Sequence, residues 1–189
     1  ACTENQFIET TVVDNSEEGL EEVSLELKSL PVEIIGEIWE ATPNTRAADA
    51  SNVDEHAIKN IWVFQYNSAG ALISAPRYYT TSSTSGTAAL KVMLRPVSDC
   101  QIYIVANTND ASWANGITLS SNLSVLTSRT FTRSTESAMY GGENKNLLMS
   151  AHVTGKTITA GVSNALGTIS LKRMVAKISF YYKIADGVK

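Results

Sequence analysis

Cysteine and histidine are scarce in this chain, whose 189 residues contain two of each. His56 and His152 stand far apart, so we expect each to lie on the surface or to be hydrogen-bonded within the fold. The sequence has no Cys-x-x-Cys pair, no His-x-x-x-His pair, no glycine-rich phosphate loop and no Gly-x-Ser-x-Gly elbow. These absences predict a protein that is not an enzyme and that holds no metal or other cofactor.

Charged residues and long apolar runs are also few. Charged side chains make up 18% of the chain, against about 25% in an average soluble protein. Small polar residues take their place, which is common in extracellular β-proteins. No basic cluster is present, so nucleic acid is not an expected partner. No apolar run approaches the roughly 20 residues that a membrane-spanning helix needs.

The beginning of the chain is strongly acidic. Residues 3–22 contain seven acidic side chains and no basic one, and the rest of the chain has a net charge of +3. Such a segment cannot bury enough apolar surface to fold alone. We therefore expect residues 1–20 to form a flexible leader and residues 21–189 to form one β-domain. Cys2 is either the lipidated cysteine of a bacterial lipoprotein or an ordinary thiol, whereas Cys100 is expected to be a buried apolar residue.

The first expected strand spans about residues 22–36 and shows a period of two. Its inward residues are expected to be Val23, Leu25 and Leu27, followed after a phase shift by Val32 and Ile34. Proline lacks a backbone donor, so Pro31 predicts that this strand lies at a sheet edge or breaks there. The polar residues at about 40–56 predict an exposed loop.

The rest of the chain predicts further strands, and together they favour an all-β sandwich. Residues 58–66 should form a central strand, residues 67–70 a turn and residues 71–80 its hairpin partner. Residues 111–145 are the least clear, with a helical turn expected at 122–126. The other expected strands cover residues 90–95, 100–106, 156–162 and 169–184, the last with a bulge near Lys172.

Three aromatic residues are candidates for a ligand surface. Tyr78, Tyr79 and Trp113 could stack on sugar rings, as aromatic side chains do in glycan-binding proteins. The interpretation that we favour is that they cover the edges of the core.

Four blocks together resemble the N-terminal domain of the Bacteroidales fimbrillin family, the subunits of type V pili. The resemblance covers roughly residues 55–185, and it rests on the order and spacing of the blocks. They are Ile58-Lys-Asn-Ile-Trp-Val-Phe-Gln-Tyr-Asn-Ser-Ala-Gly-Ala-Leu, Ile102-Tyr-Ile-Val-Ala-Asn-Thr, Leu147-Leu-Met-Ser-Ala and Ile169-Ser-Leu-Lys-Arg-Met-Val-Ala-Lys-Ile-Ser-Phe.

The resemblance implies a transthyretin-like seven-stranded sandwich and export as a lipoprotein with lipid on Cys2. It also implies cleavage by an arginine-specific protease in the loop after the first strand, where Arg46 followed by Ala47 matches. Lys28 is a second basic position, but it lies inside the predicted strand. The family has a second, C-terminal β-domain, which this chain lacks, so we expect the chain to be a fragment or a truncated subunit.

The function implied is that of a structural or adhesive pilus subunit. Cleavage at Arg46 would make the first strand separable, and its loss would open an apolar groove with unpaired backbone groups. A strand from another pilin subunit could fill this groove by donor-strand exchange. The protein would begin as an outer-membrane lipoprotein at the cell surface and end in a fimbrium, as a stalk, anchor or tip subunit. The alternative is a surface lipoprotein that does not polymerise and binds glycans or host ligands.

Overall fold

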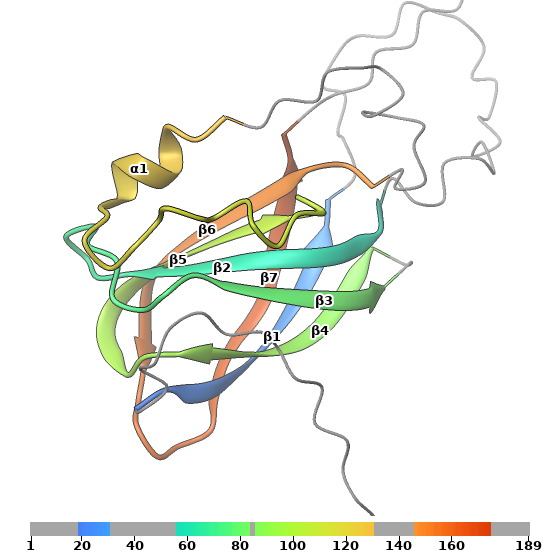
Figure 1. The fold of residues 1–189 in the computed structure, drawn as a ribbon. Helices are drawn as coiled ribbons and strands as arrows, with labels where there is room; N and C mark the ends of the chain where they lie inside the picture. Colours follow the sequence, from blue (N-terminus) through green and yellow to red (C-terminus); the bar gives the residue numbers. More distant parts are fainter. Residues whose placement is uncertain (1–18, 31–55, 84–85, 131–145, 175–189) are drawn as a thin grey trace, which may run out of the picture.

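The computed structural model describes residues 19–30, 56–83, 86–130 and 146–174 (Figure 1). These residues contain seven strands and one short helix, α1 (Leu123–Thr127). The strands are β1 (Glu21–Ser29), β2 (Ile58–Tyr66), β3 (Arg77–Ser83), β4 (Thr87–Leu94), β5 (Val97–Ala106), β6 (Met149–Ile158) and β7 (Asn164–Arg173). The predicted all-β fold with seven strands is therefore confirmed.

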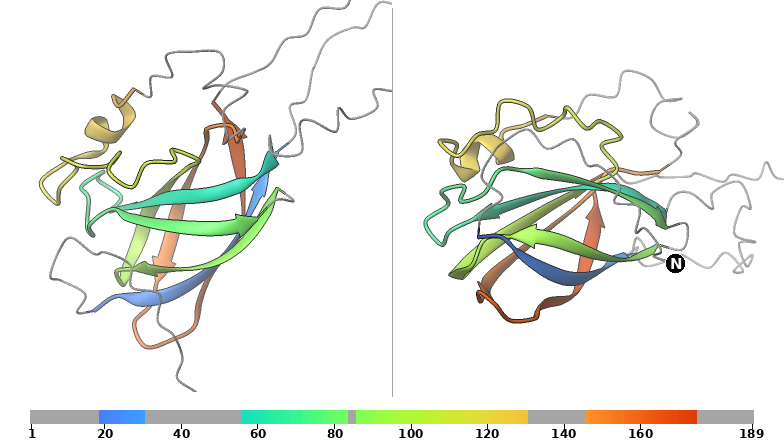
Figure 2. Two further views of the ribbon diagram at one scale, coloured as in Figure 1. Left: turned by 45° about the vertical axis from the view of Figure 1, so that its right-hand side comes forward. Right: turned by 60° about the horizontal axis from the view of Figure 1, so that its bottom comes forward.

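The strands follow one hydrogen-bonded order, β3-β2-β5-β6-β7-β1-β4. This order folds over where β6 meets β7, because these two strands are joined through only two residue pairs, Met149 with Arg173 and Ser150 with Lys172. The result is a sandwich of two layers (Figures 1 and 2). We call the layer β7-β1-β4 sheet A and the layer β3-β2-β5-β6 sheet B.

The main core lies between the two sheets. Sheet A contributes the inward side chains of β1, β4 and β7, and sheet B contributes those of β2, β5 and β6. The period of two in each strand explains this, since alternate side chains point to the same face. The fully buried members include Val23, Leu27, Val92, Ile61, Ile102, Ile104, Met149 and Leu171. Cys100 is a free thiol buried in this core, as predicted.

A second apolar cluster covers the outer face of sheet B. Trp62, Phe64 and Tyr66 of β2 point outward, and the segment after β5, with α1, packs over them. Residues 111–130, part of the region that the sequence left unclear, thus form this cover, with Ala114, Ile117 and Leu126 buried. The predicted helical turn at 122–126 is confirmed by α1, which begins one residue later.

Pro31 left two alternatives for the first strand, an edge position or a break, and the break is correct. β1 ends at Ser29, before Pro31, and it is not an edge strand, since it pairs on both sides. Two other expectations about the strands are wrong in detail. The hairpin partner of β2 begins only at Arg77, because Ala71 and Leu72 form isolated bridges and Pro76 has no amide hydrogen to donate. The bulge of β7 lies at Leu166, between Ala165 and Gly167, where Gly167 has a φ of 72°.

Other expectations fall partly outside the described residues. The strand expected at 156–162 is wrong in its bounds, because only residues 156–158 lie in a strand, the end of β6, which runs from Met149 to Ile158. Of the strand expected at 169–184, residues 175–184 lie outside the described residues, and Met174 is 58% exposed. Residues 1–18 of the leader expected at 1–20, and residues 40–55 of the loop expected at 40–56, lie outside the described residues.

Candidate functional site

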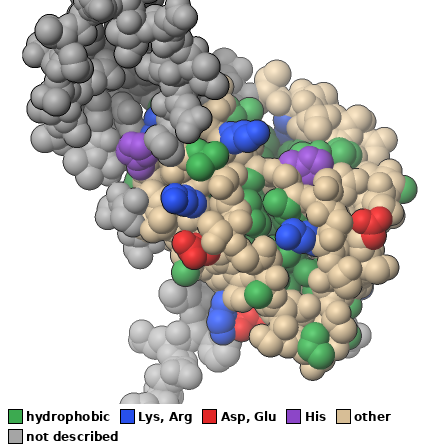
Figure 3. All heavy atoms as spheres, turned by 180° about the vertical axis from the view of Figure 1, so that it is seen from behind, with side chains coloured by type: hydrophobic (Ala, Val, Ile, Leu, Met, Phe, Trp, Pro, Cys, Tyr) green, Lys and Arg blue, Asp and Glu red, His purple; other side chains and the backbone are tan. Residues whose placement is uncertain are grey.

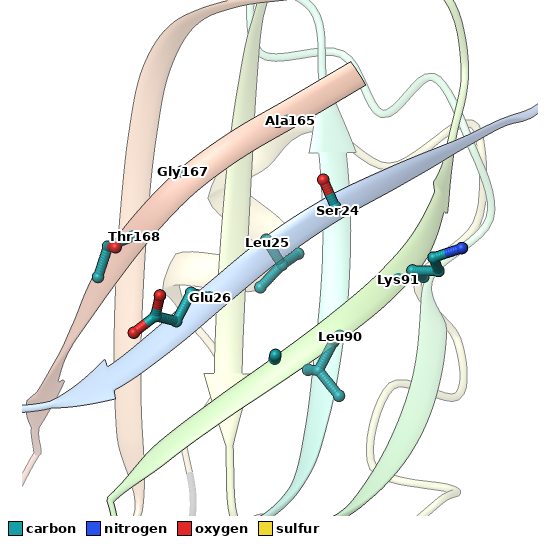
Figure 4. Close-up of a pocket in the computed structure, with 9 residues that line it drawn as sticks. Ser24, Leu25, Glu26, Leu90, Lys91, Ala165, Gly167 and Thr168 are labelled. Carbon is teal, nitrogen blue, oxygen red and sulfur yellow. The ribbon is translucent and has the colours of Figure 1, made fainter. Parts of the chain in front are cut away.

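Strand β1 occupies the middle of sheet A. It pairs antiparallel with β4, from Glu21 opposite Leu94 to Lys28 opposite Thr87. On its other side it pairs parallel with β7, from Val23 opposite Asn164 to Ser29 opposite Leu171. Figure 4 shows β1 between these two strands. Without β1, both neighbours would lose a complete set of ladder partners.

The inward side chains of β1 fill the core. Val23 and Leu27 have no exposed surface, and Leu25 is 4% exposed. They belong to the same cluster as the inward residues of both neighbouring strands, among them Val92 and Ile169. We call the space that these side chains and the β1 backbone occupy the β1 slot. Its walls are β4 and β7, and its floor is the inner face of sheet B.

β1 also makes polar contacts near its beginning, at Glu21 and at its outward residues Glu22 and Ser24. Ser24 Oγ donates to the carbonyl oxygen of Asn164 at 3.2 Å. Glu21 Oε1 accepts a hydrogen bond from the amide of Gly161 at 2.9 Å. Glu22 Oε1 lies 2.6 Å from Lys91 Nζ, but both side chains are exposed, so this ion pair adds little stability.

A shallow trough of about 720 Å³ runs over this outward face, and β1 forms its middle (Figure 4). Small side chains line much of the trough. The Glu26 side chain of β1 lies on the side of β7, and Lys91 lies on the opposite side, on β4 (Figure 4). A space-filling view from behind shows hydrophobic side chains in a hollow near the centre of that face, with lysines and arginines scattered around it (Figure 3). A trough of small side chains supplies no group with obvious chemistry.

The walls of the β1 slot are held to sheet B by contacts that do not involve β1. Gln65 of β2 is buried and forms two hydrogen bonds with the backbone of Arg95. Gln65 Nε2 donates to the carbonyl oxygen of Arg95, and the backbone N–H of Arg95 donates to Gln65 Oε1, both at 2.8 Å. The Tyr79 hydroxyl accepts a hydrogen bond from the amide of Met93 at 2.9 Å. On the other wall, the amide of Met174 donates to the carbonyl oxygen of Leu148 at 3.0 Å. Both walls therefore have supports of their own.

Asn107 joins three segments at one end of the sandwich. Its side chain accepts from the amide of Lys59 at 2.9 Å and donates to the carbonyl oxygens of Ala57, at 2.9 Å, and Leu147, at 2.8 Å. The residue is fully buried and has a φ of 65°, a conformation that asparagine tolerates better than most residues. It therefore fixes the start of β2 beside the start of β6.

The candidate ligand residues are divided between the two faces of sheet B. Tyr78 and Trp113 join the outer cluster, where the Tyr78 ring lies 5.2 Å from that of Trp62 and the Trp113 ring 6.3 Å from that of Phe64. Tyr79 packs against the main core instead. Burial raises the pKa of Tyr78, and the nearby charge of Asp110 raises it further. Burial also raises the pKa of Tyr79. The structure thus brings Tyr78 and Trp113 together and separates Tyr79 from them.

Other predicted site residues lie outside the described residues. They are Cys2, the cleavage pair Arg46 and Ala47, and the later strand positions Val32 and Ile34.

The two histidines lie in different places. His56 is in hydrogen-bond contact with Arg173, and His152 stacks on Tyr103 with ring centroids 3.8 Å apart. The described part of the chain contains no group of three or more His, Cys, Asp or Glu residues that could hold a metal ion. It also contains no helix long and apolar enough to cross a membrane.

Sequence reasoning missed Gln65 and Asn107. A signal for Gln65 was present, because it directly follows the middle of the strand, residues 61–64, which is apolar on both faces. A buried amide in such a strand must find hydrogen-bond partners, but the sequence could not say which. Asn107 had the weaker signal of an asparagine directly after a buried strand.

The comparisons with known proteins agree with this architecture. The family model described as "Major fimbrial subunit protein (FimA)" matches residues 30–181. The chain therefore belongs to this family of fimbrial subunits. No curated protein matches the chain.

Two solved structures share the fold. One is the tip fimbrial protein Mfa3 from Porphyromonas gingivalis with a C-terminal truncation, at 15% identity and a TM-score of 0.51, over 81% of this chain and 48% of that one. The other is a candidate cell adhesion protein from Parabacteroides distasonis, at 17% identity and a TM-score of 0.54, over 80% of this chain and 45% of that one. The chain thus spans about half the length of these structures.

Proposed function

We propose that this chain is part of a fimbrial subunit that polymerises when β1 is replaced by a strand from another subunit. The observation that carries this proposal is the place of β1. It is a central strand that fills the core, yet it lies at the beginning of the domain, with Arg46 between it and β2 in the sequence. A single cut at Arg46 would separate β1 from every other strand.

The energies involved suit such an exchange. Burying Val23, Leu25 and Leu27 contributes roughly 1.5–3 kcal/mol for each side chain, or about 5–9 kcal/mol in all. This is comparable with the net stability of a whole domain, about 5–15 kcal/mol. Release of β1 alone is therefore costly, whereas its replacement by an equivalent strand restores the same burial. The supports of both walls favour a slot that keeps its shape during the exchange.

The proposal also covers export and release from the membrane. Lipid on Cys2 would hold the precursor in the outer membrane, and Cys2 lies on the same side of Arg46 as β1. Cleavage and exchange would then remove the anchor and the strand in one step. The mature subunit would leave the membrane as it joins the fimbrium, and its partners would be the processing protease and other pilin subunits.

Limited digestion with an arginine-specific protease tests this function. We expect a cut after Arg46, shown by mass spectrometry, followed by slow growth of oligomers and fibres under negative stain when intact subunits that carry a donor strand are added. The Arg46→Gln variant is the matched control and should stay monomeric under the same treatment. Cleavage at other arginines with Arg46 intact, or a cut chain that never exchanges β1, would count against the proposal.

A further inference from the structure

Ser29 is the one inward position of β1 that fits its surroundings poorly. It follows Val23, Leu25 and Leu27 on the same face, and it is 6% exposed. Its hydroxyl group is buried and has no hydrogen-bond partner among the residues that the structure describes. A buried hydroxyl without a partner costs free energy, because its bonds to water are lost and nothing replaces them.

The backbone around Ser29 is well paired, so the mismatch belongs to the side chain. The amide of Ser29 donates to the carbonyl oxygen of Gly86 at 2.7 Å, and the amide of Leu30 donates to the carbonyl oxygen of Leu171 at 3.1 Å. The surroundings are also close. A β-carbon placed on Gly86 would lie 3.7 Å from the β-carbon of Ser29, and Leu171 is the paired residue on β7. These neighbours suit a small apolar side chain.

We infer that the natural occupant of the β1 slot is a strand from another fimbrial subunit that carries a small apolar residue, such as alanine, at the position opposite Leu171. This inference rests on the proposed function and adds the chemistry that selects the partner. At the positions of Val23, Leu25 and Leu27 an incoming strand can only match the apolar contacts of β1. At the position of Ser29 it can improve on β1, so this position favours exchange over re-entry of the released strand.

Peptides with the sequence of β1 itself test the inference. The probes are three fluorescent peptides of residues 19–30: the unchanged sequence, one with Ser29→Ala and one with Ser24→Ala. Each is added to the full chain after cleavage at Arg46, and binding is measured by fluorescence anisotropy. We expect the Ser29→Ala peptide to bind about tenfold more tightly than the unchanged one, which corresponds to about 1.4 kcal/mol.

The Ser24→Ala peptide is the matched control, because it has the same substitution on the same strand. Ser24 Oγ has a partner in the carbonyl oxygen of Asn164, so its loss should leave binding unchanged or weaken it. In the uncut chain, Ser29→Ala should likewise raise the urea midpoint of unfolding, and Ser24→Ala should not. This second measurement needs neither cleavage nor exchange.

The outcomes separate the inference from the function. If all three peptides enter the slot with equal affinity, exchange occurs and the role of Ser29 is wrong. If no peptide enters a chain cut at Arg46, or the chain cannot be cut there, the proposed function fails and the inference about its partner fails with it. A urea midpoint that does not rise with Ser29→Ala would overturn the mismatch itself.

Discussion

The side chain of Gln65 forms the two hydrogen bonds to a backbone that a residue of a neighbouring strand would form. Its amide group presents one donor and one acceptor to the backbone of Arg95, as a neighbouring residue in a ladder would. The contact joins β2 of sheet B to the connection between β4 and β5. Because the amide is 1% exposed, water cannot replace these bonds easily if the side chain is lost.

Substitution of Gln65 by alanine should therefore destabilise the chain. We expect a loss of about 2–4 kcal/mol, since two backbone groups of Arg95 would lose their partners. Gln101→Ala is the control, because Gln101 also binds backbone carbonyl oxygens, of Asn67 and Ser68, but at the surface. Its effect should stay below about 1 kcal/mol. Equal urea midpoints for the two variants would show that the hydrogen bonds between Gln65 and Arg95 do not stabilise the fold.

Buried apolar residues and buried polar residues differ in how far they can be predicted from the sequence. Val23, Leu25 and Leu27 could be assigned to the core, because in a strand the alternation of side chains fixes a common face. The partner of Gln65 could not be found, because Arg95 is distant in sequence and no periodicity links the two. The unpaired hydroxyl of Ser29 was equally hidden, since it depends on what its neighbours fail to offer.

Among the strands, β1 is the one whose neighbours the sequence concealed. Its alternation correctly predicted a half-buried strand, and Pro31 predicted that this strand either lies at an edge or breaks there. The break is what occurs, because β1 ends before the proline, and its two partners come from distant parts of the chain. Ser24 binds Asn164 across a separation of 140 residues, which no local pattern can reveal. The parallel pairing of β1 with β7 follows from this long connection.

Truncation of one inward residue measures how much β1 contributes while it is still attached. Leu27→Ala should lower the free energy of unfolding by about 2–5 kcal/mol, because Leu27 is fully buried and leaves a cavity. Leu119→Ala is the matched control at a side chain that is 47% exposed, and it should change stability by less than about 0.5 kcal/mol. Chemical unfolding in urea measures both. Similar values for the two variants would mean that β1 is not part of the core.

The described parts of the chain form two apolar clusters, which differ in their dependence on β1. The main core lies between the sheets and includes Val23, Leu25 and Leu27. The outer cluster includes Trp62 and Trp113 and draws no residue from β1, β4 or β7. Strand β2 of sheet B is thus buried on both faces, and its outer face is covered by the segment that follows β5. Loss of β1 should therefore open the sandwich on one side without exposing the other.

Tryptophan fluorescence can follow this asymmetry after cleavage at Arg46. In a Trp39→Phe background only Trp62 and Trp113 remain, and the indole of Trp62 donates to the carbonyl oxygen of Asp110 at 3.0 Å. β1 is displaced either by an excess of subunits that carry a donor strand or by mild urea. The emission of Trp62 and Trp113 should then stay blue-shifted, because the outer cluster is intact. A dye that binds exposed apolar surface should brighten under mild urea, where the slot stands empty, and should not brighten when another strand fills it. Simultaneous red shift and dye binding would mean that the domain unfolds as a whole, and a subunit that unfolds on losing β1 could not present a slot to the next one.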